Sequence, residues 1–338
     1  MKVSNNNTLE NKILQDIYSS VLVLDNKGMI QYINAHASKL LEISDNIEAG
    51  TTHFSANINN SYNDKFCEYI FNAIYRKDKK HIGTVKFISP SGKKHVFRIS
   101  SSYLEELDFI VITIDDLTLE NTLIEKVKNS SYIFSVFLFV MGFWVLFCEF
   151  WDMTGRKIPQ DILTIIVEII GILIFIFILI FTHLPLKELG ILTNHNKKDI
   201  KEGVIISAIC VVIMFAIKII GRKIDPTLFK PERSFFFFDP LVALSYIKTA
   251  GVQEFLARCV VQFNLERILM GKYKEPVAII LSGLLFSTLH IYYGFIFMVC
   301  AALLAMIEGV IYAKQKSLIS IWIVHYVFGI VGMSLGLA

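Results

Sequence analysis

Ionisable side chains interrupt otherwise apolar sequence at several places in the second half of the chain. Such groups are costly inside a membrane, which makes them candidates for function. Glu254 and Arg258 stand four residues apart on one helix face, and we expect them to pair because an unpaired buried charge is unfavourable. Gln253 lies about 100° away around the same helix and can face a different cavity. The other groups stand singly on separate apolar segments: His290, Glu308 and His325.

Two histidines and a carboxylate that face one cavity have two kinds of chemistry open to them. They can take a proton from a water molecule and so activate it, or they can bind a metal ion. A metal ion is possible but not favoured. Taken singly, His290 and His325 are explained as hydrogen-bonded core histidines, so the case for a site depends on their combination.

Glu308 has two interpretations. In one, its carboxylate faces the same cavity as the histidines and supplies the charge that Gln253 lacks. In the other, which we favour, it lies near the membrane interface beside Lys314 or pairs with a neighbour. Glu168 stands in the middle of another apolar stretch and is a weaker candidate, which contacts Arg or His across the bundle or marks a partner surface.

The apolar stretches are long enough to cross a membrane. Hydrophobic residues make up 54% of the 338 residues and charged residues 19%, which excludes a disordered chain and argues against a wholly soluble one. A bilayer core needs roughly 20 apolar residues per helix. Four segments meet that length: 132–151, 162–184, 203–220 and 317–337. Residues 276–313 hold two short helices around Tyr292-Tyr293-Gly294, and about seven membrane helices are predicted in all.

The first 118 residues predict an α+β domain instead. Residues 19–25 and 29–34 are rich in Val, Leu and Ile, and Asn26-Lys27-Gly28 joins them into a hairpin. Helices are expected at 35–43 and 63–75 from their apolar spacing. Three further strands are expected at 81–88, 94–102 and 109–114.

This order resembles a PAS sensor domain over residues 11–118. The resemblance rests on 21–25 (VLVLD), Gly28, 33–35 (INA) and the closing 115–118 (DDLT), after which 119–129 form a linker helix. It implies sensing of an unknown ligand, or a homodimer through this domain. Haem is one conceivable ligand, but the histidines are better explained as surface or turn residues: His36, His53, His81 and His95.

The membrane part resembles the CAAX prenyl-protease and bacteriocin-processing (CPBP, or Abi) family over residues 185–338, with two additional membrane helices at 130–184. That family has a Glu-Glu-x-x-x-Arg, a Phe-x-x-x-His and a His-x-x-x-Asn/Asp motif. The second is intact here as Phe286 and His290. The first keeps Glu254 and Arg258 but begins with Gln253, and 185–191 (PLKELGI) looks like the family's lead-in. Three motifs in order, each on an apolar helix, favour a functional site.

The resemblance implies roles for these residues. The residue at position 253 and His290 would activate water, His325 would donate to the oxyanion, and Glu254 and Arg258 would brace the helix. The third motif keeps His325 but ends in Gly329, which has no side chain to donate a hydrogen bond.

Gln253 cannot be a general base because a neutral amide does not take up a proton. Three explanations remain open: a natural pseudoprotease, a Glu→Gln change that traps an inactive form, or a base supplied by another group. The sequence thus predicts an intramembrane endopeptidase without a covalent intermediate. A silent pseudoprotease or peptide- or lipid-binding regulator is the alternative, a metal-dependent hydrolase is a third, and a transporter is a distant fourth.

Charge and topology limit the partners. The net charge of +3 comes without a basic stripe and argues against nucleic acid, so the expected partners are the lipid bilayer and a peptide or protein substrate. Polar residues 1–16 argue against a cleavable signal peptide. We expect a multi-pass protein of the cell membrane with a cytoplasmic PAS domain. This orientation places segment 221–237 outside, and its basic residues disagree with the positive-inside rule. The lysines that fall inside agree with the rule: Lys187, Lys197, Lys198, Lys272, Lys274, Lys314 and Lys316.

Overall fold

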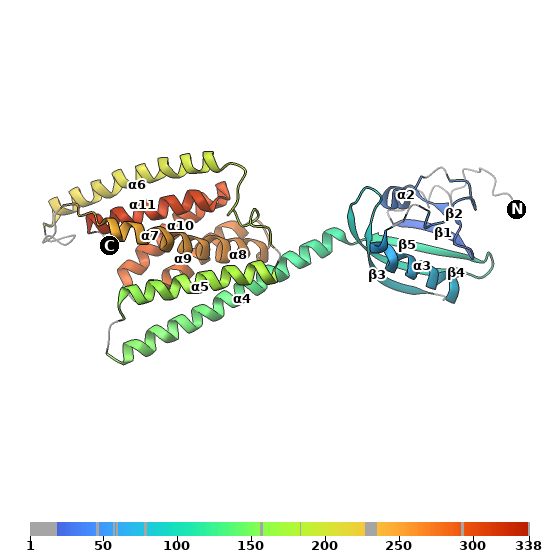
Figure 1. The fold of residues 1–338 in the computed structure, drawn as a ribbon, viewed down its shortest axis with the longest axis horizontal. Coiled ribbons are helices and arrows are strands. Elements are labelled where there is room, and N and C mark those ends of the chain that lie inside the picture. The colour runs from blue at the N-terminus through green and yellow to red at the C-terminus, as the bar shows by residue number, and fades with distance from the viewer. Residues whose placement is uncertain are drawn as a thin grey trace. The chain divides into compact units, whose positions relative to one another are not determined.

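The computed structural model describes residues 19–44, 47–56, 58, 60–77, 80–155, 158–182, 184–226, 235–291 and 294–336. The chain divides into two compact units, Met1–Glu125 and Lys126–Ala338. The first unit combines a sheet with helices and the second is helical (Figure 1). The predicted fold class, an α+β domain followed by an all-α membrane bundle, is confirmed.

A five-stranded antiparallel sheet forms the first unit, in the order β2-β1-β5-β4-β3 (strands labelled in Figure 1). The strands are β1 (Ser20–Asp25), β2 (Ile30–Ile33), β3 (His81–Ile88), β4 (Lys94–Leu104) and β5 (Phe109–Asp116). The hairpin of β1 and β2 and the run of three later strands are as predicted, and β4 and β5 each end two residues later. Gly28 adopts a φ of +80° in the hairpin turn, a conformation that favours glycine.

Helices pack on this sheet through apolar side chains. They are α2 (Ala35–Leu41), the 3₁₀ turn η1 (Ser61–Asn63) and α3 (Asp64–Arg76). Phe66 of α3 is fully buried and its ring lies 4.9 Å from that of Phe87, which stacks on Phe97 at 5.0 Å. The described core of this unit is aliphatic and aromatic.

The four histidines considered as haem ligands occupy separate places around this unit. His36 is exposed on α2, and His53 contacts Ser55 beside the hairpin turn. His81 stacks on Tyr69 at the start of β3, and His95 pairs with Asp116 at 2.9 Å. This arrangement agrees with surface and turn residues.

A single helix, α4 (Thr118–Met153), contains both the predicted linker helix and the first predicted membrane helix. The backbone amide of Thr118 donates to the Asp116 carboxylate at 2.9 Å, which satisfies one of the amides that a helix start leaves without a partner. The helix therefore begins directly after β5 and crosses the boundary between the two units without a break.

The second unit consists of α4 and the helices that follow it: α5 (Gln160–Phe181), α6 (Asn196–Ile224), α7 (Pro240–Glu254), the π-helix η2 (Phe255–Gln262), α8 (Phe263–Ile268), α9 (Lys274–Thr288), α10 (Phe295–Gln315) and α11 (Leu318–Leu335). Within the described residues, five are long and apolar enough to cross a membrane: α4, α5, α6, α10 and α11. The continuous stretch α7–η2–α8 and the shorter α9 bring the described helical rods to seven. Of the two short helices expected at 276–313, α10 is longer than expected; Tyr292 and Tyr293 between them lie outside the described residues.

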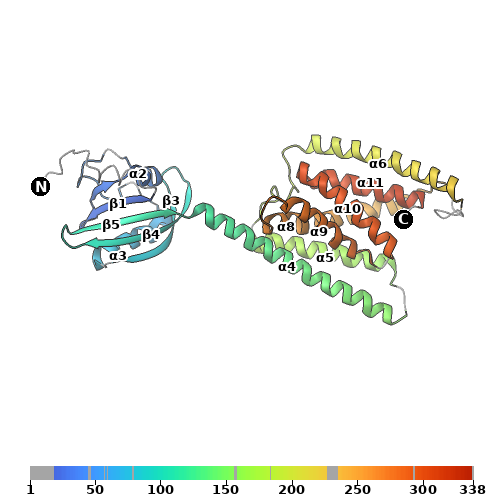
Figure 2. The same cartoon turned by 180° about the vertical axis from the view of Figure 1, so that it is seen from behind.

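The arrangement puts α7 in the middle of the bundle. In both views α6 lies at one side against α11, and α4 and α5 lie at the other (Figures 1 and 2). Glu168 of α5 accepts hydrogen bonds from Lys248 at 2.6 Å and from Thr249 at 2.7 Å, both on α7. The expected partner of Glu168, an Arg or a His, is therefore replaced by a lysine and a threonine, which fix α7 to α5.

We predict that Phe97→Ala lowers the free energy of unfolding of the first unit by about 3–5 kcal/mol, because it removes a buried ring and leaves a cavity. Urea denaturation of the fragment Met1–Glu125 measures this. Tyr75→Ala is the matched control, since the Tyr75 side chain is 92% exposed and its loss should change stability by under about 0.5 kcal/mol. Equal effects of the two substitutions would contradict the core described above.

Candidate active site

A buried ion pair lies where α7 passes into η2. Arg258 Nε donates to Glu254 Oε2 at 2.8 Å, and both side chains are 0% exposed. Arg258 Nη1 donates to Gln262 Oε1 at 3.2 Å, and Gln262 in turn donates to the Gly309 carbonyl of α10 at 3.0 Å. The expected pairing of Glu254 with Arg258 is therefore present. A π-helix is rare and often marks a functional site.

Glu308 of α10 belongs to the same cluster. Its Oε2 accepts from Arg258 Nη2 at 3.3 Å, and the residue is fully buried. Glu308 therefore pairs with a neighbour, Arg258, rather than with Lys314, and its carboxylate also faces His325, as the first interpretation supposed. Its other oxygen, Oε1, is buried without a hydrogen-bond partner in the described part of the chain. A buried polar atom in this state is unusual and marks a strained or functional place.

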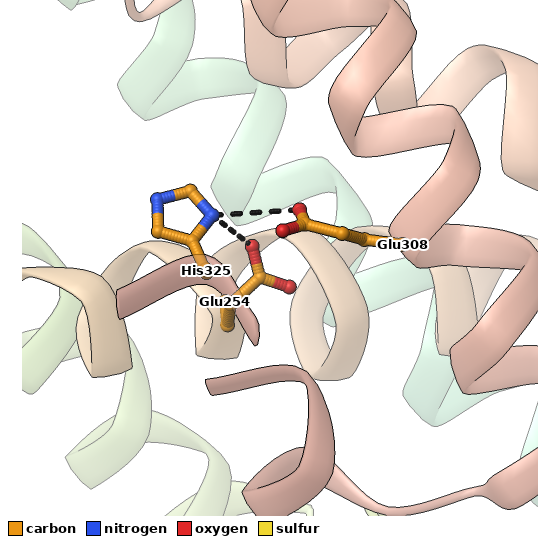
Figure 3. A group of neighbouring side chains, drawn as sticks. All are labelled: Glu254, Glu308 and His325. Atoms are coloured by element: carbon orange, nitrogen blue, oxygen red, sulfur yellow. Dashed lines mark hydrogen bonds and ion pairs between the residues drawn. The ribbon is translucent and has the colours of Figure 1, made fainter. Parts of the chain in front are cut away.

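His325 of α11 lies against the Glu254 and Glu308 carboxylates (Figure 3). Its Nδ1 is 2.9 Å from Glu254 Oε1 and 3.4 Å from Glu308 Oε2. Its Nε2 is 3.0 Å from Gln253 Oε1. Gln253 thus does not face a separate cavity: adjacent residues of α7 reach opposite edges of one imidazole ring.

Acceptor oxygens at both ring nitrogens fit a doubly protonated His325. Two carboxylates bring two negative charges and Arg258 one positive charge, so a positive imidazolium makes this buried cluster neutral. Buried charges are tolerated when they are paired in this way. The ligand atoms of Glu254, Glu308 and His325 lie within 4.8 Å of one another and could hold a metal ion. A divalent ion there would stand beside the guanidinium and leave an excess positive charge, so the residues fit a proton better than a metal.

His290 follows the C-terminus of α9, and one aromatic ring packs against both His290 and His325. The Phe286 ring lies 4.9 Å from that of His290 and 6.0 Å from that of His325. His290 Nδ1 is 3.3 Å from the Phe286 carbonyl oxygen. Because a carbonyl only accepts, Nδ1 carries the proton and the lone pair of the neutral ring is on Nε2.

Burial divides the site into two layers. Glu254, Arg258 and Glu308 are fully buried and His325 is 5% exposed. Gln253 and His290 are only half-buried. Gln253 and His290 therefore keep part of their surface accessible, while the charged side chains around His325 are enclosed.

Two glycines let α7 and α11 approach each other closely. A Cβ at Gly251 would lie 2.7 Å from the Trp322 ring, whose Nε1 donates to the Ile247 carbonyl at 2.7 Å. A Cβ at Gly329 would lie 2.5 Å from the hydroxyl oxygen of Tyr246. Sequence reasoning missed Tyr246, although its place seven residues before Gln253 puts both on one helix face.

Two other sequence features are resolved in this unit. The predicted lead-in segment contacts the core, because the Leu189 carbonyl accepts from Cys259 Sγ and from the Tyr312 hydroxyl, each at 3.1 Å. Phe235 to Phe238 are 39–59% exposed, which suits an interfacial anchor, while Ser234 lies outside the described residues.

Residues 235–331 match a protein-family model described as type II CAAX prenyl endopeptidase Rce1-like. The matched range contains every residue of the site described above. No curated protein matched the chain. Over this range the second unit is similar to the Rce1-like CAAX prenyl endopeptidases, and five of its described helices are long and apolar enough to cross a membrane.

Solved PAS-domain structures are similar to the first part of the chain. One is from a two-component sensor histidine kinase, with 15% identity, a TM-score of 0.26, and coverage of 32% of this chain and 92% of that one. Another, from Colwellia psychrerythraea, has 15% identity, a TM-score of 0.27 and coverage of 32% and 94%. The PAS domain of nitrogen regulation protein NR(II) from Vibrio parahaemolyticus has 16% identity, a TM-score of 0.27 and coverage of 32% and 98%.

We predict that Arg258→Met destabilises the protein by about 3–5 kcal/mol, because it leaves two buried carboxylates without their cation. Thermal unfolding in detergent micelles measures the loss. Lys198→Met is the matched control: it also breaks an i,i+4 pair, with Glu202, but side chains 73% and 37% exposed make that pair worth only about 0.3–0.5 kcal/mol. Adding Glu308→Gln to Arg258→Met should recover part of the stability. Equal losses in the two single variants would show that burial of the pair is unimportant.

Proposed function

We propose that this chain is a PAS-regulated intramembrane endopeptidase of the CPBP type, which hydrolyses a peptide bond at the membrane without a covalent intermediate. One observation carries the proposal. The His325 imidazole contacts Gln253 through one nitrogen and the Glu254 and Glu308 carboxylates through the other. The Phe286 ring contacts both His325 and His290, which brings the two histidines to one site. Two histidines and fixed hydrogen-bonding groups gathered among apolar helices suit acyl transfer to water.

His290 is the general base in this mechanism. As a water oxygen bonds to the scissile carbonyl carbon, His290 Nε2 takes the proton of that water and the carbonyl electron pair moves to oxygen. Breakage of the C–N bond then returns this proton to the leaving amine. The contact of Nδ1 with the Phe286 carbonyl supports the tautomer that this step needs.

Gln253 and His325 act beside the reacting carbonyl. A carboxylate at position 253 would help to remove the proton, and the amide of Gln253 only orients the water and accepts from His325. The positive charge of His325 stabilises the developing oxyanion. Glu254, Arg258 and Glu308 position His325 and maintain its charge, since they are too deeply buried to meet substrate.

The alternative function is that of a silent receptor which binds a peptide or a lipid in the same site. Gln253 is the observation that favours it, because the site has a neutral amide at the position where the resemblance implies a carboxylate. A cleavage assay separates the two functions.

We predict slow cleavage by the chain as it stands and cleavage about 100-fold faster after Gln253→Glu, which adds a second basic group beside the water. The probe is a prenylated peptide ending in Cys-aliphatic-aliphatic-X, with its unprenylated counterpart, in liposomes. Mass spectrometry detects the released C-terminal tripeptide. His290→Ala should abolish cleavage in both backgrounds.

The controls decide between the functions. Cleavage that survives His290→Ala would remove His290 as the base, and a rate that depends on added or stripped Zn²⁺ would favour the metal-dependent hydrolase. Saturable peptide binding without cleavage in any folded form would favour the receptor.

The membrane orientation belongs to the same proposal. We propose that the PAS-like unit is cytoplasmic, so that the lysines named above lie inside. Lys316 lines one cleft with Lys187 and another with Lys274, which supports a common basic end for these segments.

Helix α4 is the element through which the PAS-like unit acts on the site. We predict that inserting two residues after Glu125 changes the cleavage rate severalfold, because it turns the remainder of the helix by about 200°. Inserting seven residues is the matched control, since it alters the phase by only about 20°. If both insertions had the same effect on the rate, a signal through α4 would be excluded.

A further inference from the structure

The space beside Gly329 is filled by a tyrosine from another helix. The hydroxyl oxygen of Tyr246 lies 2.5 Å from the position that a Cβ of residue 329 would take. Gly329 stands four residues after His325, on the same face of α11. A polar group is therefore present in the place that residue 329 leaves open, and it comes from α7.

Tyr246 also belongs to the site by its other contacts. Its ring lies 6.2 Å from the His325 ring at an angle of 26°. It shares a face of α7 with Gln253, and like Gln253 it is only half-buried. Tyr246 thus lies with Gln253 in the half-buried layer of the site.

His325 alone is a poor hydrogen-bond donor to a substrate. Its Nδ1 faces the Glu254 and Glu308 carboxylates, and its Nε2 faces Gln253 Oε1. An imidazole N–H that already donates to a protein oxygen can offer a substrate oxygen only a share of that hydrogen bond. An oxyanion in this site needs another donor, and a tyrosine hydroxyl is a good one because it carries a proton at neutral pH.

We propose that Tyr246 is a catalytic residue whose hydroxyl donates a hydrogen bond to the oxyanion of the tetrahedral intermediate. This rests on the proposed function. Tyr246 O–H keeps its proton throughout: it donates to the carbonyl oxygen while His290 takes the proton of the water, and releases the oxygen when the C–N bond breaks. Gly329 is required at its position because any side chain there would displace the tyrosine ring.

The first test compares two peptides that differ in the shape of one group. One is the prenylated substrate peptide, and the other is its phosphinic analogue, in which a tetrahedral anion replaces the scissile amide. Tyr246→Phe removes only the hydroxyl and should weaken binding of the phosphinic peptide about 100-fold, while binding of the planar peptide stays within about twofold. The same variant should lower kcat by a similar factor and leave KM unchanged.

Tyr326→Phe is the matched control. Tyr326 adjoins His325 on α11, and its ring lies 6.3 Å from the ring of Tyr246, but it does not fill the space beside Gly329. Its substitution should leave both affinities unchanged. A second pair of variants tests the space itself: Gly329→Asn alone should weaken phosphinate binding because it displaces the ring. In combination with Tyr246→Ala, the Gly329→Asn substitution should raise the affinity for the phosphinic peptide at least tenfold above that of Tyr246→Ala alone.

The outcomes separate this proposal from the proposed function. Selective weakening of phosphinate binding by Tyr246→Phe, without cleavage in any form, would support the tyrosine as an anion donor and refute the endopeptidase. Equal phosphinate affinity in Tyr246→Phe and the unaltered chain would overturn the proposal. So would an equal loss in Tyr326→Phe, or no binding of the phosphinic peptide by the folded, unaltered chain.

Discussion

The fully buried guanidinium of Arg258 is the constraint on which the second unit depends. A charge in an apolar bundle is tolerated only with partners that neutralise it and satisfy its donors. Glu254 from the same helical stretch and Glu308 from α10 meet that need, and Gln262 accepts at a third nitrogen. Two carboxylates around one cation leave a net negative charge, which a protonated His325 from α11 neutralises. The side chains that neutralise one arginine thus determine how α7, η2, α10 and α11 meet.

This neutralisation also decides which residues are available for chemistry. Carboxylates that hold a guanidinium and an imidazolium cannot at the same time take protons from water. In the proposed mechanism the reactive groups are therefore the half-buried residues His290 and Gln253. Glu308 illustrates the distinction: it faces the site, as one sequence interpretation supposed, yet it contacts His325 rather than solvent. Proximity to a histidine does not by itself make a carboxylate a base.

The strands of the first unit could be predicted almost to the residue, because hairpin turns and alternating apolar positions are local signals. The pairing of Glu254 with Arg258 was equally accessible, since four residues bring two side chains to one helix face. The direction of Gln253 was not. Helical spacing correctly separates it from Glu254, but an imidazole has two nitrogens, and a ring placed across α7 is reached from both sides. Contacts such as that of Gln253 with His325, 72 positions apart, depend on tertiary packing that sequence spacing does not encode.

Gly329 shows why the loss of a side chain from a motif is a poor measure of lost chemistry. Read along the chain, a glycine at this position is simply a missing donor. In the folded bundle the same glycine permits the close approach of α7, and the volume it leaves holds the Tyr246 ring with its hydroxyl. A polar group can move from one helix to its neighbour while the space it occupies stays the same. At position 253 the neighbouring carboxylates do not replace the missing group in this way, because they already pair with Arg258 and His325. Of the two departures from the motifs, the one at position 253 therefore has the greater consequence for the proposed mechanism.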